Sequence, residues 1–538
     1  MKSSNLPWYK KSVIYQIYPW SFKDSNADGV GDLKGIIEKL DYLNDSTNQS
    51  LGVGAIWLSP IYPSPMKDFG YDISDYCNID PRFGSLEIFG ELVSKAHDRG
   101  IKIIMDLVTN HTSSLHPWFI ESRSSKNNPK RDWYIWHDPK PDGSEPNNWI
   151  SVSGGSMWTL DEKTNQYYLH NFLAEQPDLN WRNKEVQEEM KKIMEFWIAH
   201  GVDGFRVDAA SHFVEDEQFR DDPANEKYIE GKTSPYEKFS HTFSTNQPEV
   251  KEVINLMCNI CSENKDIFIV SETYLGLEDI KRFYRFCDTP VQAPFNFQLM
   301  GLPWSAQNFR TAIDTYNAAL LPEDVPIFVL GNHDRMRLAS QRGIHQARAA
   351  AVLLLTLRGT PFVYYGEEIG MHDVGIPPQK MRDGFAETLG NSFSRDPQRT
   401  PMQWNADDHA GFSTVEPWLP ISKDFKEVNV AYQETDPYSI LNLYKTLIQY
   451  RNISDTLLLG TYRSINAEAP EIYAYVRETK NELLLILINF SGVTITEPLA
   501  TRKYTMICTS NLDIPKGTQI SESITLRPHE ACILRLEK

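Results

Sequence analysis

Short apolar runs alternate with longer amphipathic stretches along most of the chain. Eight runs rich in β-branched and aromatic residues begin at Val13, Ala55, Lys102, Gly204, Ile267, Phe295, Pro326 and Thr360. The stretches between them, such as SLEIFGELVSKAHDRG and NKEVQEEMKKIMEFWIAHG, have helical spacing and end in a Gly that can close a helix. Strands that alternate with helices indicate a parallel sheet with crossover helices, and eight strands are the number that closes a barrel. The predicted fold class is therefore α/β, a (β/α)8 TIM barrel.

Two parts of the chain depart from this pattern. Residues 111–178 are rich in Trp, Pro, Asn, Ser and Gly and are too long for an ordinary loop, so we predict an inserted small domain after the third strand. Residues 454–538 show short alternating strands separated by turn residues, which is typical of a C-terminal antiparallel β-sandwich domain. The barrel itself is then built from residues 1–110 and 179–453.

Composition and charge narrow the possible partners. The chain has 538 residues, of which 41% are hydrophobic and 23% are charged, as expected of a soluble globular enzyme. Its net charge of −18 would repel nucleic acids and anionic membrane surfaces, so we expect a small neutral molecule as partner. No apolar stretch is long enough to span a bilayer and no leader pattern is visible near Met1, which favours a cytoplasmic protein, either a monomer or a homodimer.

The six cysteines are too sparse for a disulfide framework in a chain of this length: Cys77, Cys258, Cys261, Cys287, Cys508 and Cys532. Cys258 and Cys261 have the spacing of a metal or redox pair, but no second Cys or His pair lies nearby to complete four ligands. We therefore expect buried structural thiols.

Candidate chemistry lies where predicted strands end. In GFRVDAA, Arg206 and Asp208 are two residues apart on a strand and share one face, so the guanidinium should keep the carboxylate ionised. Glu272 ends the apolar run IFIVSE, where desolvation should raise its proton affinity. An ionised Asp and a protonated Glu at successive strand ends are the nucleophile and the acid/base that a retaining glycosidase needs.

Four ordered segments resemble the signature regions of the α-amylase superfamily, glycoside hydrolase family 13. They are DLVTNH, GFRVDAA, VSET and GNHD, and QPDLN resembles a fifth region. The resemblance implies that Asp208 is the nucleophile, that Glu272 is the acid/base and that Asp334 is a third catalytic carboxylate. It also implies that His111 and His333 bind the same glucose, and Arg206 is counted with them among the substrate-binding residues.

Within this superfamily the chain is most similar to the oligo-1,6-glucosidase and α-glucosidase branch, because FGYDISDY and RTPMQW are both present. The resemblance implies an ion pair between Asp68 and Arg399 that closes the far side of the first sugar pocket, so that cleavage starts from the chain end. Tyr71 would stack on the terminal glucose. Phe172 and Gln176 map to further substrate-binding positions, although a core role for Phe172 is nearly as well supported.

The sequence favours an exo-acting, retaining α-glucosidase for short oligosaccharides. In the branch it resembles, Val after the nucleophile accompanies α-1,6 preference, and Ala209 here favours maltose-like or sucrose-like substrates. Ser153 replaces an aromatic residue that lines the first sugar pocket in relatives, which leaves the width of that pocket open. The alternatives are an oligo-1,6-glucosidase, or a transglycosylating or isomerising relative of the sucrose isomerase or trehalose synthase type.

Two further classes fit less well. The inactive amylase-like subunits of amino-acid transporters lack the carboxylates found here. A metal-dependent barrel hydrolase needs ligands at the first strand, and VIYQIYPWSF contains no His.

The loop DSNADGVGD places oxygen-bearing residues at alternating positions, which suits a structural Ca²⁺ or Mg²⁺ ion. The resemblance agrees, because many relatives hold a cation there. The candidate ligands are Asp24, Asn26, Asp28, Val30 and Asp32. We expect such an ion to stabilise the loop and to take no part in bond cleavage, and we expect no organic cofactor.

Overall fold

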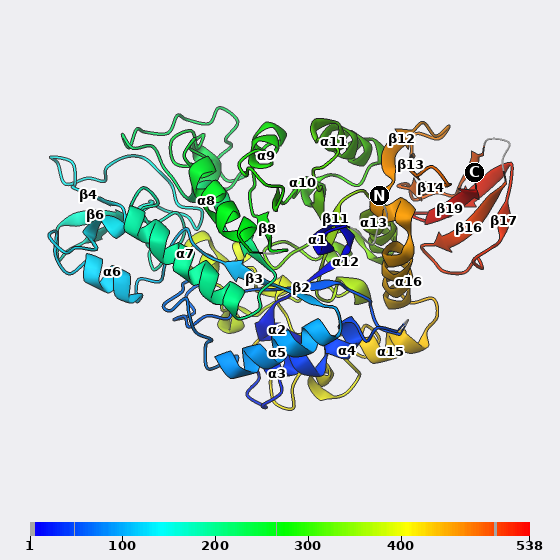
Figure 1. Cartoon of the computed structure of the whole chain (residues 1–538), viewed down its shortest axis with the longest axis horizontal. Helices are drawn as coiled ribbons and strands as arrows, with labels where there is room; N and C mark the ends of the chain where they lie inside the picture. The colour runs from blue at the N-terminus through cyan, green and yellow to red at the C-terminus, as the bar shows by residue number, and fades with distance from the viewer. Residues whose placement is uncertain (1–5, 48, 265, 500–502, 538) are drawn as a thin grey trace.

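The computed structural model describes residues 6–47, 49–264, 266–499 and 503–537, and a barrel of eight parallel strands forms its centre (Figure 1). The strands are β1 (Ile14–Ile17), β2 (Ala55–Leu58), β3 (Lys102–Leu107), β7 (Gly204–Val207), β8 (Phe268–Ser271), β9 (Gln292–Pro294), β10 (Ile327–Val329) and β11 (Thr360–Tyr364). They are ordered β10-β11-β1-β2-β3-β7-β8-β9, and a parallel bridge between Asn296 and Phe328 joins the two edges. The predicted TIM barrel is confirmed.

The sixth strand lies earlier than the sequence predicted. We expected it in FNFQLM from Phe295, but the strand ends at Pro294 and Gln298–Gly301 forms the short helix α10. Phe295 is 1% exposed and its N–H donates to the carbonyl of Ser271 at 2.9 Å, so the chain still follows the barrel there. A short apolar run cannot distinguish a buried strand from a buried helix by its periodicity, which explains the error.

The crossover helices α5 (Leu86–Asp98) and α7 (Lys184–Ala199) end as predicted. Gly100 and Gly201 follow them with φ values of 72° and 88°, in the left-handed region that a residue without a Cβ adopts at little cost. The other α-helices are α1 (Trp8–Lys11), α2 (Pro19–Phe22), α3 (Leu33–Glu38), α4 (Leu40–Leu43), α6 (Pro117–Ser122), α8 (Val250–Ser262), α9 (Leu277–Phe283), α11 (Ala306–Ala319), α12 (Leu338–Arg342), α13 (Ile344–Thr356), α14 (Gly384–Leu389), α15 (Val430–Thr435), α16 (Ile440–Ile453) and α17 (Asp455–Leu459).

The segment between β3 and α7 carries a small antiparallel sheet of its own, with strand order β4-β6-β5. Its strands are β4 (Trp136–His137), β5 (Trp158–Asp161) and β6 (Gln166–Leu169). An antiparallel bridge between His111 and Asp178 brings the two ends of the segment together, so it leaves and re-enters the barrel at one place. Figure 1 shows it in cyan at the side of the barrel opposite the C-terminal strands.

The C-terminal strands form a six-stranded sheet, ordered β12-β13-β14-β19-β16-β17, and a separate pair, β15-β18. Their bounds are β12 (Thr461–Ile465), β13 (Ile472–Glu478), β14 (Glu482–Asn489), β15 (Ile495–Pro498), β16 (Tyr504–Thr509), β17 (Gln519–Ile520), β18 (Ser523–Leu526) and β19 (Ala531–Glu537). Successive residues of β13 alternate between two cores: Tyr473 and Tyr475 join the barrel core, whereas Ala474 and Val476 join a second cluster. This alternation is why the sheet is apolar on both faces.

One cysteine prediction is wrong. Cys258 on α8 forms a disulfide with Cys287, whose Cα lies 5.8 Å away, instead of remaining a buried thiol. Cys261, Cys508 and Cys532 are free and buried, and Cys77 is free and partly exposed. The pairing joins α8 to the segment that follows α9, in two neighbouring βα units, a proximity that spacing in the sequence does not reveal. Of the helices described, none is long and apolar enough to cross a membrane.

Candidate active site

One guanidinium holds three carboxylates at the C-terminal ends of neighbouring barrel strands. Arg206, on β7, donates from Nη1 to Asp106 and to Asp208, at 2.6 Å in each case. Its Nη2 lies 2.7 Å from Oε2 of Glu272, which directly follows β8. Arg206 is 1% exposed, so solvent water does not compete for these contacts. The side chains of Asp208 and Glu272 therefore meet in one place, each attached to a different nitrogen of the same group.

The protonation of these acids departs from the sequence argument in one respect. Burial raises the pKa of Glu272 to about 7, as predicted, even though Arg206 acts to lower it. Burial also raises the pKa of Asp208 to about 7, and Arg206 only partly offsets this rise because Asp106 and Asp334 add negative charge. Arg206 therefore acts to keep Asp208 ionised, as the sequence predicted, while burial and the neighbouring acids act against it.

Ala209 joins the nucleophile candidate to the acid/base candidate through its backbone. It is a non-glycine residue in the left-handed region, with φ 47° and ψ 37°, and this conformation lets its N–H donate to Oε2 of Glu272 at 3.1 Å. Residues in this region are uncommon and concentrate at functional sites. The residue after Asp208 thus orients Glu272, a contact that the sequence did not indicate.

Asp334 and His333 follow β10 and complete the same end of the barrel. Asp334 accepts a hydrogen bond from Nη2 of Arg399 at 2.9 Å, and His333 Nε2 lies 2.8 Å from the hydroxyl of Tyr71. The rings of Tyr71 and His333 are parallel, with centroids 5.5 Å apart, and the Tyr71 hydroxyl also donates to Asp106 at 3.0 Å. These contacts connect Asp334 to the Arg206 cluster.

The charged groups around Asp334 shift its pKa in the opposite direction from those of Asp208 and Glu272. Burial acts to raise its pKa, but the neighbouring His333, Arg395 and Arg399 lower the pKa well below its usual range. Burial lowers the pKa of His333 to about 3, so His333 is neutral at pH 7. At this pH it is therefore the charges of Arg395 and Arg399 that lower the pKa of Asp334. The charges around Asp334 therefore favour its ionised form, whereas burial favours the protonated forms of Asp208 and Glu272.

The segment that returns from the inserted sheet brings Gln176 and Phe172 to His111. Nε2 of Gln176 lies 3.0 Å from Nε2 of His111 and donates to Oδ2 of Asp68 at 3.2 Å. The ring of Phe172 lies 5.2 Å from that of His111, centroid to centroid, and remains partly exposed. Nε2 of His111 also lies 3.1 Å from the carbonyl of Tyr71. The predicted substrate-binding residues are thus gathered around one site.

The predicted ion pair between Asp68 and Arg399 is replaced by a longer chain of charges. Asp68 pairs with Arg395 at 2.6 Å, whereas Arg399 pairs with Asp334. Arg395 also lies 3.5 Å from Asp334 and binds Asp383 at 2.6 Å. The sequence did not indicate Arg395 or Asp383 as parts of the site. The signal that could have found Arg395 was its place four residues before the Arg of RTPMQW.

The sequence also did not indicate two exposed side chains that directly follow the candidate catalytic acids in sequence or lie within two residues of them. Tyr274, two residues after Glu272, is 50% exposed and stacks on Phe297 with ring centroids 4.5 Å apart. The guanidinium of Arg335, the residue after Asp334, lies 5.1 Å from the Tyr274 ring. An aromatic face with a cation over it suits the apolar side of a sugar. Ser153, by contrast, is buried and its hydroxyl lies 2.9 Å from that of Ser151.

The candidate cation loop is held by its own hydrogen bonds. Asp24 accepts N–H bonds from Asn26, Ala27 and Gly29 at 2.8–3.0 Å, and Asp32 caps α3 by accepting the N–H of Gly35 at 2.7 Å. Asp28 accepts the N–H of Val30 at 2.9 Å. In the part of the chain that the structure describes, no three His, Cys, Asp or Glu side chains converge as metal ligands. Binding of a cation by the alternating oxygens of this loop stays a prediction.

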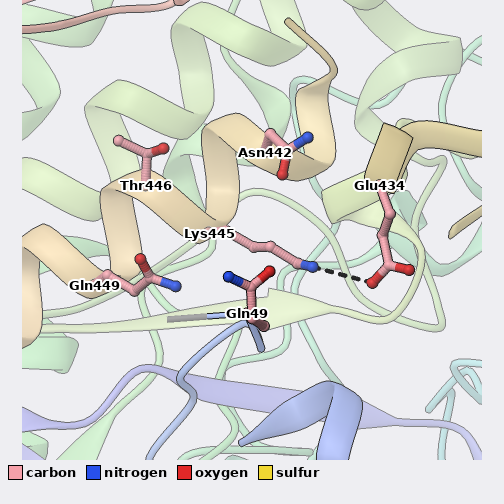
Figure 2. Close-up of a pocket in the computed structure, with 6 residues that line it drawn as sticks. All are labelled: Gln49, Glu434, Asn442, Lys445, Thr446 and Gln449. Atoms are coloured by element: carbon pink, nitrogen blue, oxygen red, sulfur yellow. Dashed lines mark hydrogen bonds and ion pairs between the residues drawn. The ribbon is translucent and has the colours of Figure 1, made fainter. Parts of the chain in front are cut away.

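A polar pocket elsewhere does not share this chemistry. Figure 2 shows that it is lined by α16 side chains together with Gln49 and Glu434, and that Lys445 pairs with Glu434 at 3.0 Å. Gln49 precedes β2, so it lies at the end of the barrel opposite the candidate catalytic acids, which lie at the C-terminal ends of their strands.

Comparison with known proteins agrees with this geometry. Residues 16–460 match the model of the α-amylase catalytic domain. An oligo-1,6-glucosidase from Parageobacillus thermoglucosidasius is 39% identical over 98% of this chain and 99% of its own. The crystal structure of the α-glucosyl transfer enzyme XgtA is similar with a TM-score of 0.91 and 36% identity, over 99% of this chain and all of that one. The trehalulose synthase MutB from Pseudomonas mesoacidophila MX-45 gives a TM-score of 0.88 and 33% identity over the same shares. The chain therefore belongs to the α-amylase family of glycoside hydrolases.

Proposed function

We propose that this enzyme is an exo-acting, retaining α-glucosidase that removes the terminal non-reducing glucose from short oligosaccharides. The observation that carries the proposal is the attachment of Asp208 and Glu272 to the two terminal nitrogens of Arg206, at 2.6 and 2.7 Å. This brings both carboxyl groups to one glycosidic bond. Retaining glycosidases need two carboxyl groups about 5–5.5 Å apart, close enough for one of them to bond to the sugar.

The reaction then follows in two displacements. The carboxylate of Asp208 attacks the anomeric carbon while Glu272 gives its proton to the leaving oxygen, which breaks the glycosidic bond and forms a glucosyl ester. Glu272, now ionised, takes a proton from water, and the water oxygen attacks the same carbon and releases Asp208. The raised pKa of Glu272, about 7, suits a group that must be an acid first and a base afterwards.

The charged chain around Asp334 supports binding of a single terminal glucose. Asp68, Asp334 and Arg399 present hydrogen-bonding groups to sugar hydroxyls, and Arg395 ties Asp68 to Asp334 across the site. A wall of this kind leaves no path for a chain to continue past the first sugar, so internal cleavage of amylose should be slow. Ala209 favours α-1,4 over α-1,6 linkages. Because Ala differs from Val by only a few carbon atoms, the difference in transition-state free energy between the two linkages should be about 1–3 kcal/mol.

Variants of the two acids test the assignment. Asp208→Asn and Glu272→Gln should each abolish turnover of maltose while the unfolding midpoint stays close to that of the wild type. Kinetics on maltose, sucrose, isomaltose and amylose would establish the linkage preference at the same time. Substantial activity in either variant, or rapid internal cleavage of amylose, would refute the proposal.

Transfer or isomerisation is the second candidate. The structural likeness to XgtA and MutB favours it, as does the exposed Tyr274–Arg335 pair, which could hold an acceptor sugar beside Glu272. Product analysis separates the two reactions. Free glucose from sucrose supports hydrolysis, and a rearranged disaccharide supports isomerisation.

A further inference from the structure

Residues 382–396, which we call the capping loop, close on themselves through two aspartates. Oδ2 of Asp396 accepts the N–H groups of Arg382 and Asp383 at 2.6 and 3.2 Å, and Oδ2 of Asp383 accepts the N–H of Arg395 at 2.6 Å. Both aspartates are buried, although six of the twelve residues between them are exposed and the other six are partly exposed. The neck of the loop is therefore fixed even though its middle faces solvent.

Asp383 also fixes the side chain of Arg395. Its two oxygens accept from Nη2 and Nε of that guanidinium at 2.6 and 2.9 Å, and the Asp383 side chain is 0% exposed. A bidentate pair sets the plane of a guanidinium as well as its position. The ring of Phe385 covers the same group, with its centroid 3.8 Å from Cζ of Arg395. Arg395 is thus held from the capping loop on two sides.

The same guanidinium reaches the sugar-binding acids. Nη2 of Arg395 donates to Asp68 at 2.6 Å, and Nη1 lies 3.5 Å from Asp334. A single residue, Arg395, therefore links Asp383 to the two carboxylates that would hold the glucose hydroxyls. The contacts that link Asp383 to both of them run through Arg395.

The capping loop also bridges two parts of the pocket wall. Gly384 packs so closely on the segment before Asp68 that an added Cβ would lie 2.9 Å from the carbonyl of Lys67. At the far end of α14, the hydroxyl of Thr388 donates to the carbonyl of Ser153 at 2.5 Å. The loop thereby joins the Asp68 segment to the turn at Ser153 in the inserted segment.

We propose that Asp383 is a positioning residue that sets the closed end of the sugar pocket, and so limits the enzyme to removing one terminal glucose, by holding Arg395 against Asp68 and Asp334. This inference rests on the proposed function, because it concerns how the same site selects its substrate. Asp383 itself touches no substrate.

Asp383→Asn tests the inference, because it keeps the shape of the side chain and removes the charge that orients Arg395. The KM for maltose should rise about 10- to 100-fold, the scale of loss expected when binding groups move by about 1 Å, while kcat changes little. Maltose should also appear among the first products from maltotetraose, because a looser closed end admits a second sugar beyond the first. Asp383→Glu, which restores the charge, should recover part of the affinity. Glu387→Gln, an exposed change on the same helix, should leave both constants at the wild-type value.

Phe385→Ala provides a second variant if Asp383→Asn does not fold, since it removes the ring over Arg395 and leaves the ion pair. It should raise the KM in the same direction by a smaller factor. If the wild type is active and the folded variants keep its KM, the inference is wrong and the proposed function stands. The same conclusion follows if Glu387→Gln raises the KM as much as Asp383→Asn does. A wild type inactive on every glucoside would overturn the proposed function and the inference together.

Discussion

The shared contact of Asp106 and Asp208 with Arg206 makes the acid limb of the pH profile a test of the site. Both carboxylates bind the same nitrogen at 2.6 Å, so the two oxygens are no more than about 5 Å apart. At that distance two like charges repel by about 3 kcal/mol at an effective dielectric constant of about 20. Asp106 is one of the groups that raise the pKa of Asp208 to about 7. Asp106→Asn removes this repulsion.

The expected result is a shift of the acid limb to lower pH. A repulsion of about 3 kcal/mol corresponds to about 2 pKa units, and partial relaxation of Arg206 reduces the observable shift to about 1–2 units. The sign is fixed: without the Asp106 charge, Asp208 loses its proton more readily and is ionised at a lower pH. The maximal rate should also fall, because Tyr71 and Trp57 both donate to the Asp106 carboxylate.

The assay is the pH dependence of kcat/KM for 4-nitrophenyl α-glucoside, which reports the ionisations of the free enzyme. Asp142→Asn removes a charge from an exposed turn of the inserted segment and should leave the profile unchanged. An acid limb that stays in place or moves to higher pH in Asp106→Asn would refute the electrostatic reasoning.

Three further predictions concern stability. Cys258→Ser should lower the free energy of unfolding by about 3–4 kcal/mol, the loop-closure value for a separation of 29 residues, and a denaturation curve that does not respond to the variant or to reductant would contradict the disulfide. Added Ca²⁺ should raise the unfolding midpoint of the wild type, Asp28→Asn should remove that rise, and equal midpoints with Ca²⁺ and with chelator would argue against the cation. Burial raises the pKa of Glu367 to about 7, so the folded state binds this proton more tightly and stability should fall as pH rises from about 4.5 through 7. Glu367→Gln should flatten this dependence in melting curves, and an unchanged slope would exclude Glu367 as its source.

The sequence predicted the parts of the site that lie on regular strands. Arg206 and Asp208 are two residues apart on β7, and Glu272 ends an apolar run, so strand periodicity alone placed them at one end of the barrel. The sixth strand was misplaced because its apolar residues continue into the buried helix α10.

Contacts between distant segments could not be predicted in the same way. Arg395 meets Asp68 across 327 residues of sequence, through a loop that has no periodicity to locate it. The protonation of Asp208 depends on burial and on Asp106 and Asp334 together, whereas the motif shows only its neighbour Arg206. Pairing of Cys258 with Cys287 likewise depends on how two βα units pack.

The configuration of the first sugar released tests the central claim most directly. ¹H NMR of the anomeric protons during the first minutes of maltose hydrolysis, before mutarotation, distinguishes the two outcomes. A covalent bond to Asp208 followed by attack of water predicts that α-glucose accumulates first from the non-reducing end. If β-glucose appeared first, water would have attacked the substrate directly, and the assignment of Asp208 as nucleophile would be wrong.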